Sequence, residues 1–162
     1  MRTAALYAYA LGFLLTSCDG GASSAPSAPR RAAVARPLEI VSVSAGDEDV
    51  RALVTRERAA RPGRPLLVYV GAPWCEPCRR FHEAAAGGKL DAAFPGLVLL
   101  ELDADRDGER LKRAGYSSRL IPLFAVPGPD GGASGRQIEG SIKGDGAVAE
   151  ISPRLAALLG ER

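Results

Sequence analysis

Two short and almost uninterrupted apolar runs limit what this chain can fold into more than any other feature of its sequence. They are Leu66–Val70 (LLVYV) and Leu97–Leu102 (LVLLEL). Such runs are typical of strands buried on both faces, as in a parallel sheet covered by helices. Between them, residues from about 75 to 86 read as a helix that a pair of glycines then weakens or ends. A strand, a helix and a second strand predict a parallel pair with a crossover helix, and therefore an α/β fold.

The rest of the chain from residue 38 to residue 162 continues this alternation. Further strands are expected at residues 38–43, 123–126 and 137–142, the last two joined by a turn-rich segment at 127–135. Further helices are expected at residues 47–60 (capped by Ser44 or Asp47), 105–114 and 147–159, where Pro153 marks an alternative start. The order βαβαβαββα predicts a central mixed sheet flanked by helices, with a parallel core and an antiparallel C-terminal hairpin.

The first 17 residues have the pattern of a signal peptide. Arg2 supplies a positive charge, and residues 4–15 form an apolar run that is too short to span a membrane. The following Leu-Thr-Ser-Cys18 resembles the lipobox of bacterial lipoproteins, which implies cleavage before Cys18 and acylation of that residue. An ordinary secretory signal, with Cys18 left as a free thiol, is the alternative. The resemblance implies a lipid anchor on a bacterial membrane, facing the periplasm or the cell exterior, and leaves inner or outer membrane open.

Residues 18–37 predict a flexible tether between this anchor and a folded domain at residues 38–162. Gly, Ala, Ser and Pro dominate the tether, so it cannot bury enough apolar surface to offset the entropy of ordering. The whole chain has 21 Lys and Arg against 19 Asp and Glu, a net charge of +2. This near-balance argues against a nucleic-acid partner that depends on massed phosphate neutralisation.

The chemistry is expected at Trp74-Cys75-Glu76-Pro77-Cys78. A Cys-x-x-Cys pair after a buried strand and at the start of a helix places the first sulfur where free N–H groups stabilise a thiolate. Cys75 can then attack a substrate disulfide, and Cys78, one turn further on, can resolve the mixed disulfide. Pro77 suits the first helical turn because its missing N–H costs nothing there.

This motif resembles the active site of the thioredoxin superfamily, and the resemblance covers about residues 38–162. It implies that Cys75 is the nucleophile, Cys78 the resolving thiol and Trp74 a flanking platform, with no dissociable cofactor. Ile121-Pro122 matches the cis-proline loop of the family, so a cis bond is expected before Pro122. The Cys-Glu-Pro-Cys form is similar to membrane-tethered thioredoxins that reduce apocytochrome c, and it implies recharging by a transmembrane thiol-transporting partner.

The chain departs from the family's pattern at the acid that assists the resolving thiol. The usual buried Asp is replaced by Tyr69, which we expect to be a core residue, and the Lys that pairs with it is replaced by Glu101. Glu83 and Leu123 stand where the family usually has a proline and a threonine. Glu101 can be a surface or strand-end carboxylate, or it can substitute for the missing acid, as can Glu76.

Glu76 also bears on the direction of electron flow. A carboxylate next to the Cys75 sulfur disfavours the thiolate and so lowers the reduction potential, although the helix dipole acts in the opposite direction. We therefore expect a reductase of disulfide-containing proteins. Apocytochrome c, a periplasmic thiol enzyme and a copper-site cysteine pair stay open as substrates.

The main alternative function is a Cu(I)-binding carrier. Two thiolates and one imidazole suit Cu(I), and His82 shares a helical face with Cys78. A structural zinc site needs four ligands, and Cys75, Cys78 and His82 supply three at most. We therefore predict no metal site for the reductase. The intact cysteine pair also argues against a binding module that keeps only the fold.

Overall fold

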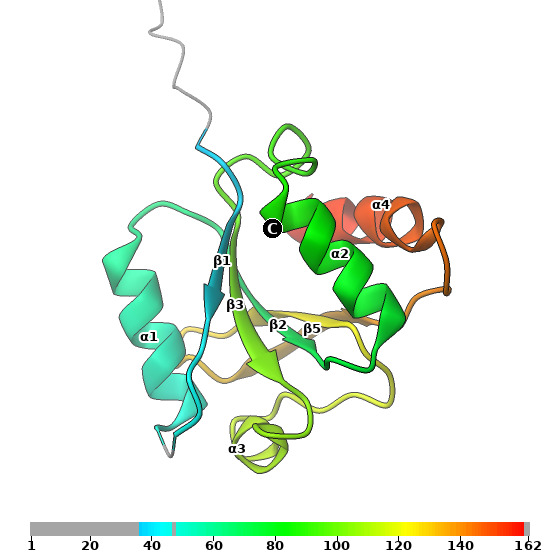
Figure 1. Cartoon of the computed structure of the whole chain (residues 1–162). Helices are drawn as coiled ribbons and strands as arrows, with labels where there is room; N and C mark the ends of the chain where they lie inside the picture. The colour runs from blue at the N-terminus through cyan, green and yellow to red at the C-terminus, as the bar shows by residue number, and fades with distance from the viewer. Residues whose placement is uncertain (1–35, 47, 161–162) are drawn as a thin grey trace, which may run out of the picture. The chain divides into compact units, whose positions relative to one another are not determined.

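The structure, a computed structural model, describes residues 36–46 and 48–160. The predicted signal peptide, Cys18 and nearly all of the tether lie outside the described residues. Within these described residues, five strands and four helices follow one another in the order that the sequence predicts (Figure 1). The strands are β1 (Glu39–Ser42), β2 (Leu66–Gly71), β3 (Val98–Asp103), β4 (Leu123–Pro127) and β5 (Ala133–Glu139). The helices are α1 (Val50–Ala60), α2 (Glu76–Ala86), α3 (Gly108–Arg113) and α4 (Ala147–Gly160).

The five strands form one mixed sheet in the order β1-β3-β2-β4-β5. β3 pairs with β1 and with β2 in parallel, and β4 pairs with β2 and with β5 in the antiparallel direction. The predicted parallel core and antiparallel C-terminal hairpin are therefore confirmed. This strand order, with these directions and with helices on both faces, is that of the thioredoxin fold.

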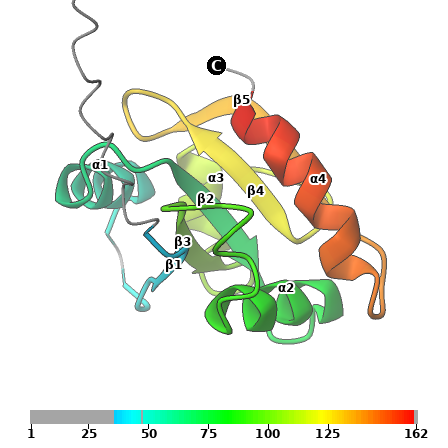
Figure 2. The same ribbon diagram turned by 90° about the horizontal axis from the view of Figure 1, so that it is seen from above.

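Alternate residues of the central strands face two different hydrophobic layers, because side chains of a strand point to opposite faces in turn. Leu67 and Tyr69 of β2 pack with Phe81 of α2 and Ile151 of α4. The intervening residues of β2 pack in a second cluster with residues of α1 and α3. Accordingly, α2 and α4 lie together on one face of the sheet (Figure 2).

Several helix and strand boundaries differ from those predicted. α1 is capped by Asp49, whose carboxylate accepts a hydrogen bond from the Arg51 amide, and not by Ser44. Residue 47, the other predicted cap, lies outside the described part of the chain. α3 begins later than predicted because the carboxylate of Asp103 binds the amides of residues 105 and 106 in a turn of their own. β5 begins within the segment predicted to be a turn.

The prediction that Pro153 could mark the start of the last helix is wrong. α4 begins at Ala147 and continues through Pro153. Ile151 on one side of the proline and Leu155 on the other are both buried against the sheet, so tertiary packing holds both halves in one helix. The Ser152 hydroxyl donates a 2.7 Å hydrogen bond to the Val148 carbonyl within the same turn.

The described part of the chain starts at the amino ends of the parallel strands. The Gly96 amide donates to the Arg36 carbonyl over 2.7 Å, and the Leu38 amide donates to the Asp91 carboxylate over 3.0 Å. These bonds attach residues 36–38 to the loop before β3. Among the described residues, no helix has the length and apolar character that a bilayer span requires.

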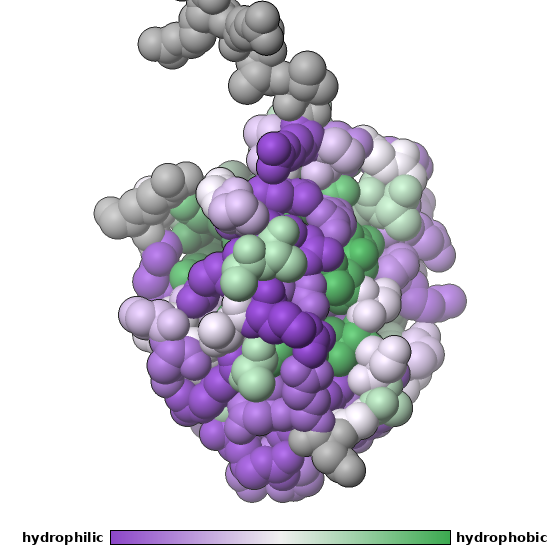
Figure 3. All heavy atoms as spheres, turned by 90° about the vertical axis from the view of Figure 1, so that its left-hand side faces the viewer, coloured by the Kyte–Doolittle hydropathy of each residue, from purple (hydrophilic) through white to green (hydrophobic). Residues whose placement is uncertain are grey.

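The edge strand β1 is shielded by charge. Glu39 binds the guanidinium groups of Arg61 and Arg64. The hydrogen bond from Arg61 outweighs the effect of partial burial, and with Arg64 it holds the pKa of Glu39 below its ordinary value. The face that contains α1 and β1 is mostly polar, with only scattered apolar side chains (Figure 3). Charged side chains along an edge strand disfavour pairing with another chain.

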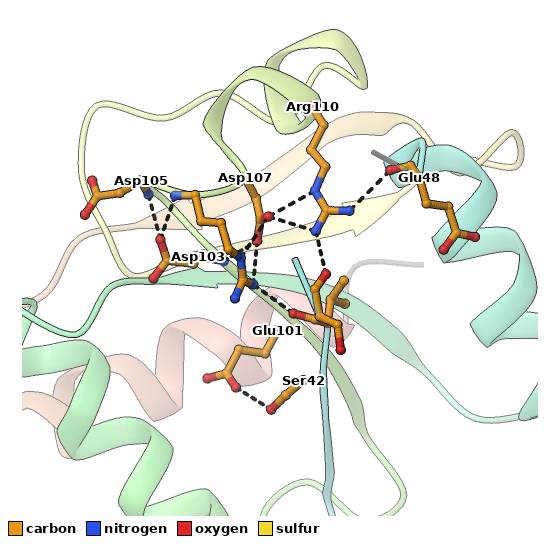
Figure 4. Close-up of polar contacts among 10 residues, drawn as sticks. Ser42, Glu48, Glu101, Asp103, Asp105, Asp107 and Arg110 are labelled. Carbon is orange, nitrogen blue, oxygen red and sulfur yellow. Dashed lines mark hydrogen bonds and ion pairs between the residues drawn. The ribbon is translucent and has the colours of Figure 1, made fainter. Parts of the chain in front are cut away.

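A buried ionic cluster connects α3 to the chain between β1 and α1 (Figure 4). Asp107 is 1% exposed and accepts hydrogen bonds from Arg106, from Arg110 and from the Asp103 amide. Arg110 also donates to the carbonyls of Ser44 and Glu48 over 3.3 and 3.2 Å. Burial opposes ionisation of Asp107, but these hydrogen bonds more than offset it and lower the pKa of its carboxyl.

Replacing Asp107 with Asn is expected to lower the free energy of unfolding by about 3 kcal/mol at neutral pH, because the substitution leaves a buried guanidinium without its anion. The lowered pKa makes this stabilisation complete above the ordinary aspartate value of about 3.9 and removes it as the pH falls through the folded-state value. Urea unfolding should therefore show a constant gap between the wild type and Asp107→Asn above about pH 5, and a narrowing gap below about pH 4. Exposed Glu109 of the same helix supplies the control, Glu109→Gln, and a gap that does not narrow in acid would contradict the prediction.

Candidate active site

The two cysteines lie where the chain leaves β2 and enters α2. Cys75 is the N-cap of α2, and Cys75 and Cys78 form a disulfide with 5.3 Å between their Cα atoms. The Cys78 amide donates a 3.3 Å hydrogen bond to the Cys75 sulfur. Pro77 occupies the first turn of the helix, as predicted. A sulfur at an N-cap lies against free N–H groups and the positive end of the helix dipole, so this position favours a thiolate at Cys75.

The disulfide is seated deeply against the end of β2. Cys75 is 5% exposed and Cys78 3%. The Tyr69 hydroxyl donates a 3.0 Å buried hydrogen bond to the Cys78 carbonyl. A side chain on Gly71 would meet the Cys78 Cβ at 3.3 Å and the Tyr69 hydroxyl at 3.2 Å, so glycine at this position allows the close approach of helix and strand.

Tyr69 is more than the core residue that the sequence predicts. Its ring stacks on Phe124 and is tilted against Phe81, as expected of a core residue. Its hydroxyl, however, reaches the active-site helix. Burial, and after it the charge of Glu101, raises the pKa of Tyr69 far above the ordinary range, so this phenol keeps its proton and acts as a hydrogen-bond donor.

The loop before β4 covers the disulfide from the other side. The Ile121–Pro122 peptide bond is cis, as the sequence predicts. Ile121 packs against the small cluster that contains both cysteines. The Pro122 carbonyl accepts a 2.9 Å hydrogen bond from Gly140, which connects this loop to the chain after β5.

Three large apolar side chains of the loops near the disulfide are exposed. They are Trp74 at 67%, Leu120 at 60% and Ile142 at 55%. Trp74 directly precedes Cys75, and its indole N–H donates a 2.7 Å hydrogen bond to the carboxylate of Asp105. Apolar surface exposed beside a reactive group is typical of a binding site for another molecule. The sequence predicts Trp74 as a flanking platform of the active site, but it does not indicate that Leu120 and Ile142 are exposed.

The Glu76 carboxylate interacts with two cations, Arg80 and Lys143. Its carboxylate accepts hydrogen bonds from Arg80, over 3.1 Å, and from the Gly144 amide, over 3.3 Å. These contacts, first of all the one with Arg80, lower the pKa of Glu76, and Lys143 adds a smaller attraction. Arg80 also pairs with Asp145 at 2.7 Å. The Glu76 charge is therefore partly compensated, and the sequence alone does not predict this.

Glu101 is neither a free surface carboxylate nor in contact with the disulfide. One carboxylate oxygen lies 2.7 Å from His82 Nδ1. The other accepts a 2.8 Å hydrogen bond from the Ser42 hydroxyl of β1 (Figure 4). His82 and Glu101 line a hollow of about 330 Å³ whose wall also contains Cys78 and Tyr69. The sequence indicates each of these two residues but not their pairing.

Among residues 36–46 and 48–160, no three His, Cys, Asp or Glu side chains lie close enough together to hold a metal ion. The ring nitrogen of His82 that faces Glu101 is engaged there rather than with the two sulfurs. The geometry therefore adds no support to the copper-carrier hypothesis. The two aspartates that follow β3 are already bound by other side chains and are not free to hold a metal ion. Arg106 and Arg110 bind Asp107, and Trp74 binds Asp105.

Replacing Asp105 with Ala is expected to release the Trp74 indole while leaving the fold intact. Trp74 is the single tryptophan of the chain, so its fluorescence reports on this contact alone. The variant should show lower tryptophan anisotropy, and its free energy of unfolding should change by no more than about 0.5 kcal/mol because both groups are exposed. Glu109→Ala on α3 is the matched control. Equal anisotropy in Asp105→Ala and the wild type would show that the hydrogen bond does not hold the indole.

No family model matches the chain. Thioredoxin H5 of Oryza sativa subsp. japonica is 30% identical over 70 residues, which are 43% of this chain and 49% of that protein. The match thus spans about half of the relative's length. A thioredoxin of Trichomonas vaginalis aligns with a TM-score of 0.49 and 23% identity over 76% of this chain and 97% of its own. Oxidised thioredoxin O1 of Arabidopsis thaliana aligns with a TM-score of 0.42 and 20% identity over 64% and 86%. By the order and direction of its own strands, the chain has the thioredoxin fold, with a cysteine pair at the start of α2.

Proposed function

We propose that this chain is an extracytoplasmic thiol–disulfide oxidoreductase that reduces disulfides of other proteins. The observation that carries the proposal is the Cys75–Cys78 disulfide at the N-terminus of α2, beside the cis-proline loop. A bridge between residues three apart adds little stability, because so short a loop removes little entropy from the unfolded chain. A role in disulfide exchange therefore explains the position of this disulfide better than a role in stabilising the fold.

The proposed cycle transfers two electrons from the cysteine pair to the substrate. The Cys75 thiolate attacks one sulfur of the substrate disulfide, and the other substrate sulfur leaves as a thiolate and takes up a proton. The Cys78 thiol then loses its proton and attacks the Cys75 sulfur. The mixed disulfide breaks, the second substrate sulfur leaves, and the Cys75–Cys78 disulfide is formed. The N-cap position of Cys75 supports its role as the attacking sulfur.

The substrate is proposed to be a protein segment that lies across the exposed apolar side chains near the disulfide. Trp74, Leu120 and Ile142 offer contact area but no charge, so they favour an apolar stretch around the substrate cysteine. Apocytochrome c is the substrate that the resemblance of the Cys-Glu-Pro-Cys motif supports. A transmembrane thiol-transporting protein is the proposed source of the two electrons that regenerate the dithiol.

The proposed location depends on the sequence before the folded domain. The signal-peptide pattern of residues 1–17 and the lipobox-like Cys18 support a lipid anchor on a bacterial membrane, with the domain on its outer side. Disulfide exchange with folded or folding proteins fits such a compartment, where disulfides persist.

Replacing Cys75 with Ser is expected to abolish insulin reduction, and replacing Cys78 with Ser is expected to trap a mixed disulfide with the substrate. The first change removes the attacking sulfur, and the second removes the sulfur that resolves the intermediate. Turbidity measures insulin reduction, and mass spectrometry without reductant detects the trapped species. Cys18→Ser removes the third cysteine and is the control that should keep full activity. Full activity in Cys75→Ser would refute the proposed function.

The reductase direction is tested by the reduction potential and by two substitutions with opposite expected signs. Equilibration with a dithiol buffer should give a potential of about −270 mV or below, whereas a value near about −120 mV would indicate an oxidant. Glu76→Gln removes a negative charge next to Cys75 and should raise the potential, by on the order of 10 mV. Arg80→Gln removes the cation that pairs with this carboxylate and should lower the potential by a similar amount. Shifts of the same sign in both variants would contradict the electrostatic argument.

A further inference from the structure

His82 of α2 and Glu101 of β3 meet at the wall of the hollow that is also lined by Cys78. His82 lies one turn after Cys78 on α2, so the two side chains share a helical face. Glu101 is the partner of Tyr69 in the parallel register of β3 and β2. Tyr69 in turn donates its hydroxyl hydrogen to the Cys78 carbonyl. Tyr69 therefore links the strand that carries Glu101 to the turn of α2 that carries Cys78.

The hydrogen bonds of Glu101 define which ring nitrogen of His82 carries the proton. An ionised carboxylate only accepts hydrogen bonds, so at neutral pH the Nδ1–H of His82 is the donor across the 2.7 Å contact. The second carboxylate oxygen is occupied by the Ser42 hydroxyl at 2.8 Å, which holds the carboxylate in place. In the neutral ring, Nε2 then carries the lone pair and is the atom that can accept a proton.

The hollow offers a path from this ring to the resolving cysteine. Its volume of about 330 Å³ is large enough for several water molecules, and its wall contains both Cys78 and His82. His82 is 40% exposed and Glu101 23%, so the pair lies at the mouth of the hollow, whereas Cys78 lies deeper at 3%. A proton that leaves the Cys78 sulfur can therefore travel through water to the ring.

We propose that His82 accepts the proton of the Cys78 thiol, through water in this hollow, when Cys78 resolves the mixed disulfide, and that Glu101 is the positioning residue that orients the ring. The inference rests on the proposed function. The proton moves from the Cys78 sulfur to His82 Nε2, the Cys78 thiolate attacks the Cys75 sulfur, and the substrate thiolate leaves. The imidazolium that forms is stabilised by Glu101. When an electron donor attacks Cys75 and reduces the disulfide again, the Cys78 sulfur leaves as a thiolate and takes a proton back from His82.

The other charged and titratable groups around the hollow do not take this role. They are Tyr69 of β2, Arg79 and Glu83 of α2, and Asp103 and Arg106 at the end of β3. Tyr69 keeps its proton because burial raises its pKa. The arginines stay protonated at any working pH. Asp103 binds the amides of the following turn, and Glu83 is exposed to solvent.

The test is the reaction of the reduced full chain with the aromatic disulfide dithiobis-nitrobenzoate, followed by stopped-flow absorbance. Attack by Cys75 releases the first coloured thiolate, and attack by Cys78 releases the second, so one trace separates the two steps. All variants carry Cys18→Ser, so that only the active-site pair reacts. In His82→Gln the second phase should slow on the order of tenfold to a hundredfold at neutral pH, while the first stays within about twofold.

The pH profile separates a proton acceptor from a packing residue. In the wild type the pH profile of the second phase should reach a plateau, because an internal acceptor and not solvent takes the thiol proton. In His82→Gln the rate should keep rising with pH, because solvent alone removes the thiol proton. Glu101→Gln should slow the second phase several-fold. Glu83→Gln removes a carboxylate from the same wall and should change neither phase.

The outcomes separate this inference from the function on which it rests. If no coloured thiolate is released in two steps by the wild type, the proposed function fails and the inference fails with it. If the wild type shows both phases but His82→Gln keeps the second phase and its pH profile, the inference alone is overturned. An equal slowing of both phases in His82→Gln also overturns it, because a proton acceptor for Cys78 does not affect attack by Cys75.

Discussion

The buried hydrogen bond from the Tyr69 hydroxyl to the Cys78 carbonyl holds the first turn of the active-site helix against the sheet. An unpaired hydroxyl at that depth would cost about 1–3 kcal/mol, so the first turn of α2 cannot move away from β2 without loss. The absence of a side chain at Gly71 allows the approach, and the stacked ring of Phe124 fixes the phenol. Three features of the site depend on this contact between the first turn of α2 and β2. They are the N-cap position of Cys75, the amide of Cys78 that donates to the Cys75 sulfur, and the hollow lined by Cys78.

A phenol in this place changes how charge is distributed around the disulfide. The resemblance to thioredoxins leads one to expect a carboxylate beneath the cysteines, whereas Tyr69 is a donor that stays neutral. The ionisable groups lie further out, with Glu101 and His82 on one side and Glu76 and Arg80 on the other. The first pair faces the resolving cysteine, and the second lies near the attacking one. In the proposed mechanism, His82 and Glu101 serve proton transfer, and Glu76 and Arg80 tune the reduction potential.

The order of helices and strands, the mixed sheet and the cysteine motif could be predicted because each depends on local pattern. Continuous apolar runs identify β2 and β3, and the cis bond before Pro122 follows from the resemblance. The late start of α3 and the passage of α4 through Pro153 depend on side-chain bonds and tertiary packing that periodicity does not record. The pairing of His82 with Glu101 was missed for a related reason. One signal was present, since alternate residues of β3 face α2 and Glu101 is in phase with buried Leu99.

The place where the chain joins the sheet has a consequence for how the domain can be presented. Residues 36–38 are attached at the amino ends of the parallel strands, whereas the disulfide follows the carboxyl end of β2. A six-residue strand such as β2 is about 20 Å long, so the two features occupy opposite poles of the sheet. A domain held by the chain before residue 36 therefore turns its reactive pole away from the point of attachment. In the proposed lipid-anchored form, the point of attachment at residue 36 would therefore not obstruct access to the cysteines.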